Sequence, residues 1–448
     1  MKRTRNGGRR GAELSRKDFL HLGGAGLAGA ALFGAAGCGG GGGQEGGNEL
    51  IFSWGKDATG TLPTLIEKFN EQNKGQIRVT HRVMPQDTGQ YFDQLRTEFQ
   101  SGASEIDVIG GDVIWPAQFA AQGYIADLTD RFTDADEFLP GPMASNTYDD
   151  KLWGVPWYTD AGLLYYRKDL LEQAGFSGPP VTWDELKEMA QKVMQDEGIK
   201  SGFVFQGAQY EGGVCNGCEY IWSHGGDILD PDDPSKVIIE SPESIAGFAT
   251  ERSMIADGVA PQSVLTAMED QSHATFIRGD SVFLRNWPYV YALLSNPEES
   301  KIKPDQVGIA QIPVAEESMQ SYSTLGGWNF FINANSEKQD QAWEFIRFMT
   351  APEQLKTNAV QGSKLPPRRA LYEDSEILEK VPVARLGKEA IIENSSPRPV
   401  SPVYSDMSLA LAEQLNSSLK GTTSPEQAVK TLQSELQEIA DQGEQAAS

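Results

Sequence analysis

Residues 50–109 read LIFSWGKDATGTLPTLIEKFNEQNKGQIRVTHRVMPQDTGQYFDQLRTEFQSGASEIDVI. Three short segments, at 50–54, 77–83 and 106–109, carry the branched and aromatic residues that are typical of strands. The two segments between them repeat apolar residues every three or four positions: Leu62, Leu65, Ile66 and Phe69, then Phe92, Leu95 and Phe99. That spacing places the apolar residues on one face of a helix. Strands that alternate with helices predict a parallel sheet covered by helices, so we expect an α/β fold.

Capping sequences predict where three later helices begin. Thr182 precedes Glu185 by three residues, which is the spacing of a capping box. Two further starts are expected from similar patterns, at Ser336 with Gln339 and at Ser424 with Pro425 and Gln427. The chain has no internal repeat at the level of its sequence.

The first 47 residues predict an exported protein with a lipid anchor. Residues 1–17 hold seven Lys or Arg, and residues 20–36 are mostly Gly, Ala and Leu. This apolar run is too short and too rich in glycine for a transmembrane helix and is typical of a signal peptide. The small residues before Cys38 resemble a bacterial lipobox. We therefore expect a signal peptide at 1–37, followed at 38–47 by a lipidated Cys38 and a flexible Gly-rich tether.

The export route is open between two alternatives. Residues 15–20 read SRKDFL, which resembles a twin-arginine signal with Lys in place of the second Arg, and the general secretory route is equally compatible. Either route predicts an extracytoplasmic protein attached to the cell membrane by its lipid anchor only. No second apolar span follows residue 47.

The charge of the chain argues against nucleic acid as a partner. The full chain has a net charge of −25, and without residues 1–37, which hold seven basic and two acidic groups, the charge is −30. A body this acidic repels phosphate backbones.

The size of the chain suggests two domains. Its hydrophobic content of 39% and its nine Trp are ample for a core, and some 400 residues follow the leader.

The cysteines and histidines give no support to a metal or redox centre. Besides Cys38, the only cysteines are Cys215 and Cys218, spaced C-x-x-C. Outside the cytoplasm this pair is a possible disulfide, and two free thiols are the alternative. Zinc would need more ligands than these two sulfurs, and only three His follow the leader. We expect no metal and no cofactor.

Five motifs carry a resemblance to a known family. They are DAGLLYYRKDLL at 160–171, QYEG at 209–212, RNWPY at 285–289, TLGGW at 324–328 and PRP at 397–399. In this order they resemble the trehalose/maltose-binding branch of the extracellular solute-binding proteins (family 1) of ABC sugar importers. The resemblance covers nearly all of the chain after residue 50.

The resemblance implies a two-lobe periplasmic-binding-protein fold of type II, like the maltose-binding protein, with the ligand cleft between the lobes. It implies lobe 1 at 48–160 and 302–336, and lobe 2 at 161–301 and 337–448. The lobes would close about a hinge on a small carbohydrate. The partners would be the transmembrane subunits of an ABC permease, and the protein would be a monomer without enzymatic activity.

A sugar site needs carboxylates in the plane of the ring and aromatic faces above it, because a pyranose has hydroxyls around an apolar C–H face. Carboxylates and guanidinium groups suit neighbouring hydroxyls because each makes two hydrogen bonds. Asp112 follows the strand at 106–109, at the end where open α/β sheets bind ligands. The residues that we expect to bind the ligand are Asp112, Tyr158, Asp160, Glu269, Trp287, Gly327, Trp328 and Arg398.

Each of these residues also has an ordinary structural reading. Asp112 could cap a helix that begins near Ile114. Trp287, Tyr158 and Trp328 could pack in the core, Arg398 could form a structural salt bridge, and Glu269 could lie on a solvated helix face. The Gly326-Gly327 pair is expected to let backbone N–H groups approach the ligand.

Two departures from the family leave the ligand open. Residues 55–60 offer no clear equivalent of a Glu that relatives place there, and Tyr91 stands where trehalose- and maltose-binding relatives have Arg. The resemblance therefore leaves trehalose, maltose, sucrose and a glucosylated glycerol or glycerate as alternatives. A glycoside hydrolase or lyase would need two opposed carboxyls, and a metal or peptide receptor is a third class.

Overall fold

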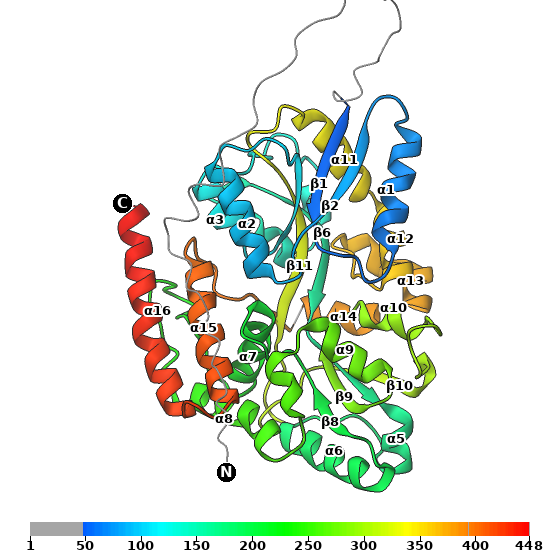
Figure 1. The fold of residues 1–448 in the computed structure, drawn as a ribbon, viewed down its shortest axis with the longest axis vertical. Coiled ribbons are helices and arrows are strands. Elements are labelled where there is room, and N and C mark those ends of the chain that lie inside the picture. Colours follow the sequence, from blue (N-terminus) through cyan, green and yellow to red (C-terminus); the bar gives the residue numbers. More distant parts are fainter. Residues whose placement is uncertain (1–47, 393, 448) are drawn as a thin grey trace, which may run out of the picture. The chain divides into compact units, whose positions relative to one another are not determined.

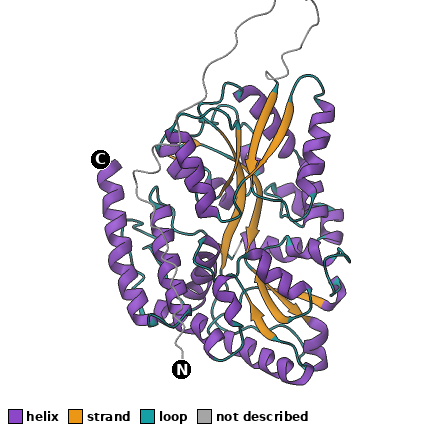
Figure 2. Cartoon of the chain, in the orientation of Figure 1, coloured by secondary structure: helices purple, strands orange, loops and turns teal. Residues whose placement is uncertain are grey.

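The computed structural model describes residues 48–392 and 394–447, which form a six-stranded sheet, a four-stranded sheet and a two-stranded hairpin together with their helices (Figures 1 and 2). The predicted signal peptide, Cys38 and the tether lie outside the described residues. No helix of the described part is long and apolar enough to cross a membrane.

The first sheet has the order β12-β11-β3-β1-β2, with β6 paired to β11. Its strands are β1 (Glu49–Trp54), β2 (Arg78–Val83), β3 (Val108–Asp112), β6 (Val155–Ala161), β11 (Ser323–Ile332) and β12 (Ser395–Ser396). β1 pairs in parallel with β2 and β3, whereas β11 runs antiparallel to β3 and β6. The three strands predicted within residues 50–109 are thus confirmed, and so is their parallel arrangement.

Helices surround the first sheet. They are α1 (Thr61–Gln72), α2 (Thr88–Gln100), α3 (Pro116–Ala121), α4 (Pro140–Ser145), α11 (Gln339–Met349), α12 (Pro352–Gly362), α13 (Ser375–Lys380) and α14 (Pro382–Ile392). Short elements join them: 3-10 helices at Ala135–Glu137 and Arg369–Glu373, and a hairpin of β4 (Thr147–Tyr148) and β5 (Lys151–Leu152). The apolar faces predicted for α1 and α2 are buried, because Leu62, Leu65, Phe92 and Leu95 are at most 4% exposed.

The second sheet has the order β10-β7-β9-β8. Its strands are β7 (Leu163–Arg167), β8 (Ser201–Val204), β9 (Ser281–Asn286) and β10 (Val307–Ala310). The helices near it are α5 (Lys168–Gln173), α6 (Trp183–Glu197), α9 (Glu269–Ile277) and α10 (Val290–Leu294), with 3-10 helices at Gln262–Thr266 and Pro304–Gln306. Helices α6 and α9 contact β8 and β9, so they bury this sheet.

Four further helices form a layer with its own apolar core. They are α7 (Glu211–Ser223), α8 (Pro242–Ala256), α15 (Tyr404–Leu419) and α16 (Pro425–Ala447). Val214, Cys218, Leu411 and Leu432 belong to the cluster that they enclose. Figure 1 shows α15 and α16 side by side, next to α7 and α8, and the contacts between these helices agree with the view.

Two of the three predicted caps are confirmed. Thr182 and Glu185 make the full capping box of α6, and Ser424 Oγ accepts a hydrogen bond from Gln427 N at 3.2 Å at the start of α16. The prediction that Ser336 caps a helix is wrong. Helix α11 begins at Gln339, its N-cap residue is Lys338, and no side chain caps it. Instead, Ser336 Oγ donates to the buried Asp107 Oδ1 at 2.6 Å.

The predicted lobe boundaries stay a prediction, but two segments pack differently from the expectation. Strand β10 falls within 302–336, which was assigned to lobe 1, yet it pairs antiparallel with β7 of the second sheet. Helices α11 and α12 fall within 337–448, assigned to lobe 2, yet both contact α1, and α11 also contacts β11. The reason is that the chain crosses between the sheets more often than the order of its motifs reveals.

The strand β6 leads directly into β7, so the chain passes from one sheet to the other at Gly162. A side chain has no room there, because a Cβ atom on Gly162 would lie 1.9 Å from Glu219 Oε1. The carbonyl oxygen of Gly162 accepts a hydrogen bond from Ser323 Oγ at 2.8 Å, at the start of β11. The crossing is therefore held tightly at one point.

Replacing Gly327 tests how closely β6 and β11 approach each other. Its φ is 130°, and a Cβ atom would lie 2.5 Å from the carbonyl oxygen of Tyr158. We expect Gly327→Ala to lower the free energy of unfolding by at least about 2 kcal/mol in chemical denaturation. Gly178→Ala is the matched control, because nothing lies within 4 Å of a Cβ there. Equal unfolding midpoints for both variants would contradict this account.

Candidate functional site

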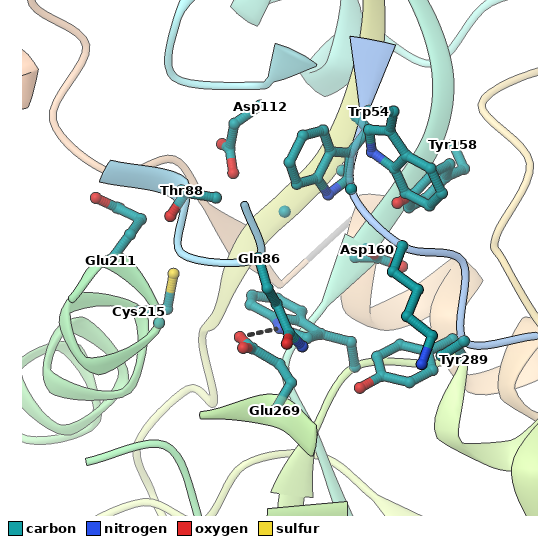
Figure 3. Close-up of a pocket in the computed structure, with 18 of the residues that line it drawn as sticks. Trp54, Gln86, Thr88, Asp112, Tyr158, Asp160, Glu211, Cys215, Glu269 and Tyr289 are labelled. Carbon is teal, nitrogen blue, oxygen red and sulfur yellow. Dashed lines mark hydrogen bonds between the residues drawn. The ribbon is translucent and has the colours of Figure 1, made fainter. Parts of the chain in front are cut away.

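A cavity lies where the carboxyl ends of β1, β3 and β6 face the start of α7 and α9 (Figure 3). Side chains from strands of the first sheet line it on one side, and the segment after β9 and the starts of α7 and α9 line it on the other. All eight residues predicted to bind the ligand are among them: Asp112, Tyr158, Asp160, Glu269, Trp287, Gly327, Trp328 and Arg398. The structure thus brings together residues that are spread over 286 positions of the sequence. Their contact with a ligand remains a prediction.

Arg398 is the centre of a buried ionic network. Its Nη1 donates to Glu211 Oε1 at 2.6 Å and its Nη2 to Asp112 Oδ1 at 3.1 Å. Glu211 also accepts hydrogen bonds from Tyr404 Oη at 2.7 Å and from Ser408 Oγ. The Nε of Arg398 is buried and has no partner among the described residues. Arg398 therefore forms a structural ion pair and still keeps one donor unused.

Asp112 lies at the end of β3, as the sequence predicts. Its Oδ1 accepts a hydrogen bond from Ile114 N at 3.2 Å, but α3 begins only at Pro116, with Trp115 before it. The carboxylate therefore stabilises the turn after β3 and does not cap a helix. Burial raises the pKa of Asp112 and the charge of Glu211 adds to the rise, while Arg398 opposes it.

Asp160 is a buried carboxyl of the cavity that the protein supports weakly. It is 7% exposed, and its Oδ1 has no hydrogen-bond partner within the described part of the chain. Burial raises its pKa to about 8; Asp112 adds to the rise, while Lys364 and Arg285 oppose it. Burial therefore favours the protonated form of this carboxyl near neutral pH.

Trp287 is held in one orientation by three neighbours. The Cζ of Arg285 lies 4.2 Å from the ring centroid, and Trp287 Nε1 donates to Glu269 Oε1 at 3.3 Å. A Cβ atom on Gly326 would lie 2.9 Å from the Trp287 ring, so only glycine leaves room for the indole. Glu269 Oε2 accepts a second hydrogen bond from Tyr210 Oη at 2.8 Å. Glu269 thus positions two rings and is not on a solvated helix face.

Trp328 and Tyr158 contribute further aromatic surface. The Trp328 ring packs edge-on against Trp54 at 5.8 Å, and Tyr158 meets the same Trp54 at 6.3 Å. Tyr91 lies behind Trp328, fully buried, and its hydroxyl donates to the carbonyl oxygens of Ser53 and Gly110. It is not among the lining residues, so the position where relatives have Arg contributes to the core here.

The sequence did not point to Lys364, which is 4% exposed and lines the cavity. Its Nζ donates to Asp57 Oδ1 at 3.0 Å. The same Nζ lies over the rings of Trp54, Trp157 and Tyr158, at 5.0, 5.4 and 5.3 Å from their centroids. Residues 55–60 thus place one carboxylate, that of Asp57, at the cavity, but this carboxylate already forms an ion pair with Lys364. No local pattern could reveal a pair separated by 307 positions.

The possible disulfide between Cys215 and Cys218 is not present, because both residues are buried free cysteines. Both lie on α7, but their side chains lie in different surroundings. Cys215 lines the cavity, whereas Cys218 belongs to the apolar cluster beneath α7, α8 and α15. Burial raises the pKa of both thiols, which keeps them protonated and unreactive. Within the described residues no group of His, Cys, Asp or Glu could hold a metal ion.

Lys364→Met tests the buried ion pair. Burial on its own would raise the pKa of Asp57, but Lys364 and the hydrogen bonds from Leu62 N and Thr59 hold it below its usual value. The stabilisation is therefore present above about pH 4 and is lost as the pH falls through the folded-state pKa.

We expect Lys364→Met to cost about 3–5 kcal/mol of unfolding free energy at pH 7, and less at pH 3, as measured by urea denaturation. Lys68→Met is the control, because its pair with Glu353 is exposed and contributes little. A cost that does not depend on pH would contradict the proposed role of Asp57.

Comparisons with known proteins agree with this geometry. Residues 55–356 match the family described as bacterial extracellular solute-binding protein. The probable ABC transporter-binding protein of Deinococcus radiodurans is 32% identical over 370 residues, which cover 80% of this chain and 86% of that protein. The maltose-bound MalE3 of T. maritima is 38% identical with a TM-score of 0.83, over 87% of this chain and 99% of that one.

A solute-binding protein of Agrobacterium radiobacter in complex with ribitol shares the fold, with a TM-score of 0.78 at 24% identity over 88% of this chain and 99% of that one. These comparisons confirm the family and the two-lobe fold that the motifs predict. The chain belongs to the bacterial extracellular solute-binding proteins, the substrate-binding components of ABC importers.

Proposed function

We propose that the cavity binds an α-glucosidic disaccharide or a small glucoside, such as trehalose, maltose or sucrose, and that the protein delivers it to the transmembrane subunits of an ABC permease. One observation carries the proposal: the cavity combines the aromatic rings of Trp287, Trp328 and Tyr158 with the carboxyls of Asp112 and Asp160. This is the combination that ring faces and hydroxyls of a sugar require.

Ligand binding would act by closing the two lobes. The cavity wall includes Asp112 from the first sheet and Trp287 after β9 of the second, so one sugar touches both. A ligand that contacts both lobes stabilises the closed state in proportion to its preference for that state. The lipid on Cys38 and the tether at 38–47 would keep this receptor beside its permease.

The charge of the cavity favours an uncharged ligand. Its wall holds six carboxyl groups, on Asp57, Asp112, Asp160, Glu211, Glu269 and Asp270, and three cationic groups, on Lys56, Lys364 and Arg398. Lys364 and Arg398 are already engaged in ion pairs. A ligand carboxylate would therefore meet net repulsion. This favours glucosylglycerol over glucosylglycerate as the alternative ligand.

Titration of a sugar panel tests the function. We expect calorimetry on the mature chain to show one-to-one binding of at least one of trehalose, maltose, sucrose or glucosylglycerol, and weaker binding of glucosylglycerate. The raised pKa of Asp160 would also suit a general acid, so glucose release is assayed in the same samples. Turnover of a disaccharide, or binding of none of these ligands, would overturn the proposal.

Trp287→Ala is the variant that links this binding to the cavity. We expect the affinity to fall at least a hundredfold, since the ring is the stacking surface that three neighbours position. Trp343→Ala is the control, because Trp343 is half-buried on α11 and does not line the cavity. Unchanged affinity in Trp287→Ala would rule out the proposed site.

The pKa of Asp160 predicts that sugar binding releases protons. Ligand hydroxyls donate to the ionised carboxylate, so binding lowers a pKa that is about 8 in the free protein. The affinity should therefore rise between pH 6 and pH 8 and level off above. Calorimetry at pH 7 in two buffers of different ionisation enthalpy measures the release directly. Asp160→Asn should remove the dependence on buffer, and equal heats for the unmodified protein would contradict this role.

A further inference from the structure

A second hollow adjoins the cavity. One wall is the beginning of α2, with Asp87, Thr88 and Gln90, and the opposite wall is the face of α15 that carries Ser405 and Leu409. Ile114 and Gln209 also line it. Its free volume is about 220 Å³, compared with about 170 Å³ for the cavity itself. We call this hollow the α2–α15 groove.

The groove continues the cavity and is not an isolated surface depression. Thr88, Tyr210 and Glu211 line both spaces, so the two share a wall. In Figure 3, Thr88 and Glu211 lie at the opposite side of the cavity from Tyr158 and Tyr289. A ligand that extends from the Tyr289 side past Thr88 would therefore enter the groove.

The junction between the two spaces has an unused polar group. The hydroxyl oxygen of Thr88 is buried and has no hydrogen-bond partner among the described residues. Glu211, across the junction, already accepts hydrogen bonds from Arg398, Tyr404 and Ser408, so it is held in place as a wall of the junction. A buried hydroxyl without a partner costs free energy unless a ligand or water satisfies it. The Thr88 hydroxyl is therefore a polar anchor for a group that passes from cavity to groove.

The side chains of the groove match a sugar unit in chemistry. Gln90 and Gln209 are exposed amides, which donate and accept hydrogen bonds, and Leu409 is 65% exposed beside them. An exposed Leu next to exposed amides offers an apolar surface for C–H groups and partners for hydroxyls. The groove carries no unpaired cation among its lining residues, which agrees with an uncharged ligand.

We infer that the α2–α15 groove is a subsite for one additional sugar unit, so that a receptor whose cavity binds a disaccharide also takes a linear trisaccharide and holds it more tightly through the unit in the groove. This inference rests on the proposed function, because it assumes that the cavity holds sugar. It assigns to Thr88, Gln90, Gln209 and Leu409 a role in selecting ligand length.

Two matched sugar pairs test the subsite: maltose with maltotriose, and sucrose with raffinose, titrated into the mature chain by calorimetry. In at least one pair we expect the trisaccharide to bind about tenfold more tightly than the disaccharide, which corresponds to about 1.4 kcal/mol. The double variant Gln209→Ala, Leu409→Ala changes exposed side chains only. We expect it to remove the gain and to bring the trisaccharide within about twofold of the disaccharide.

Val181→Ala is the matched control, because Val181 is 51% exposed and lies outside both spaces. It should leave both affinities unchanged. Tight disaccharide binding with an equal or weaker trisaccharide affinity in each pair would overturn the subsite and leave the proposed function intact. A trisaccharide gain that survives the double variant would overturn the role of the groove. Binding of no sugar of either length would overturn the function and the subsite together.

Discussion

The cavity depends on the ion network in which Arg398 joins Asp112 to Glu211. Asp112 ends a strand of the first sheet, Glu211 begins α7, and Arg398 follows β12 in a segment stiffened by Pro397 and Pro399. A buried pair of charges is costly unless its remaining hydrogen-bonding groups are satisfied. Tyr404 and Ser408 satisfy Glu211, so α15 is tied into the same network. The position of α7 relative to β3, and hence one wall of the cavity, follows from these contacts.

The cavity has two kinds of side chain: rings whose orientation is fixed by their neighbours, and polar groups with an atom that has no hydrogen-bond partner. Trp287 is fixed by Arg285, Glu269 and the absence of a side chain at Gly326. In contrast, Asp160 Oδ1, Arg398 Nε and Thr88 Oγ1 are buried atoms without partners in the described structure. Rings that are already oriented lose little entropy when a ligand binds. Polar atoms without partners would gain hydrogen bonds from the proposed ligand, so both groups would favour its binding.

The strands could be predicted because their signals are local. The eight ligand-binding candidates come mainly from the motifs that resemble the family; all eight line one cavity, and their contact with a ligand stays a prediction. The strand-helix alternation in residues 50–109 and the turn after β3 are visible in short windows of sequence. What the sequence could not reveal depends on distant partners. Ser336 does not cap α11 because the helix begins only at Gln339; its Oγ accepts from Lys338 N before the helix and donates to the distant Asp107. The role of Lys364 depends on Asp57, which lies 307 positions away in the sequence. The cysteine pair looks like a disulfide in sequence, yet α7 directs one thiol to the cavity and the other to the core.

The carboxyls buried at the cavity are compensated in two different ways. Three of them, Asp57, Asp112 and Glu211, have a cation at hydrogen-bond distance, and Asp160 has none there. Protonation lowers the cost of burying Asp160, and burial accordingly raises its pKa to about 8. In the proposed complex, ligand hydroxyls would offer the ionised form the donors that the protein lacks. A bound sugar would therefore stabilise a charge on Asp160 that burial alone disfavours, which would couple the chemistry of the ligand to the protonation of the site.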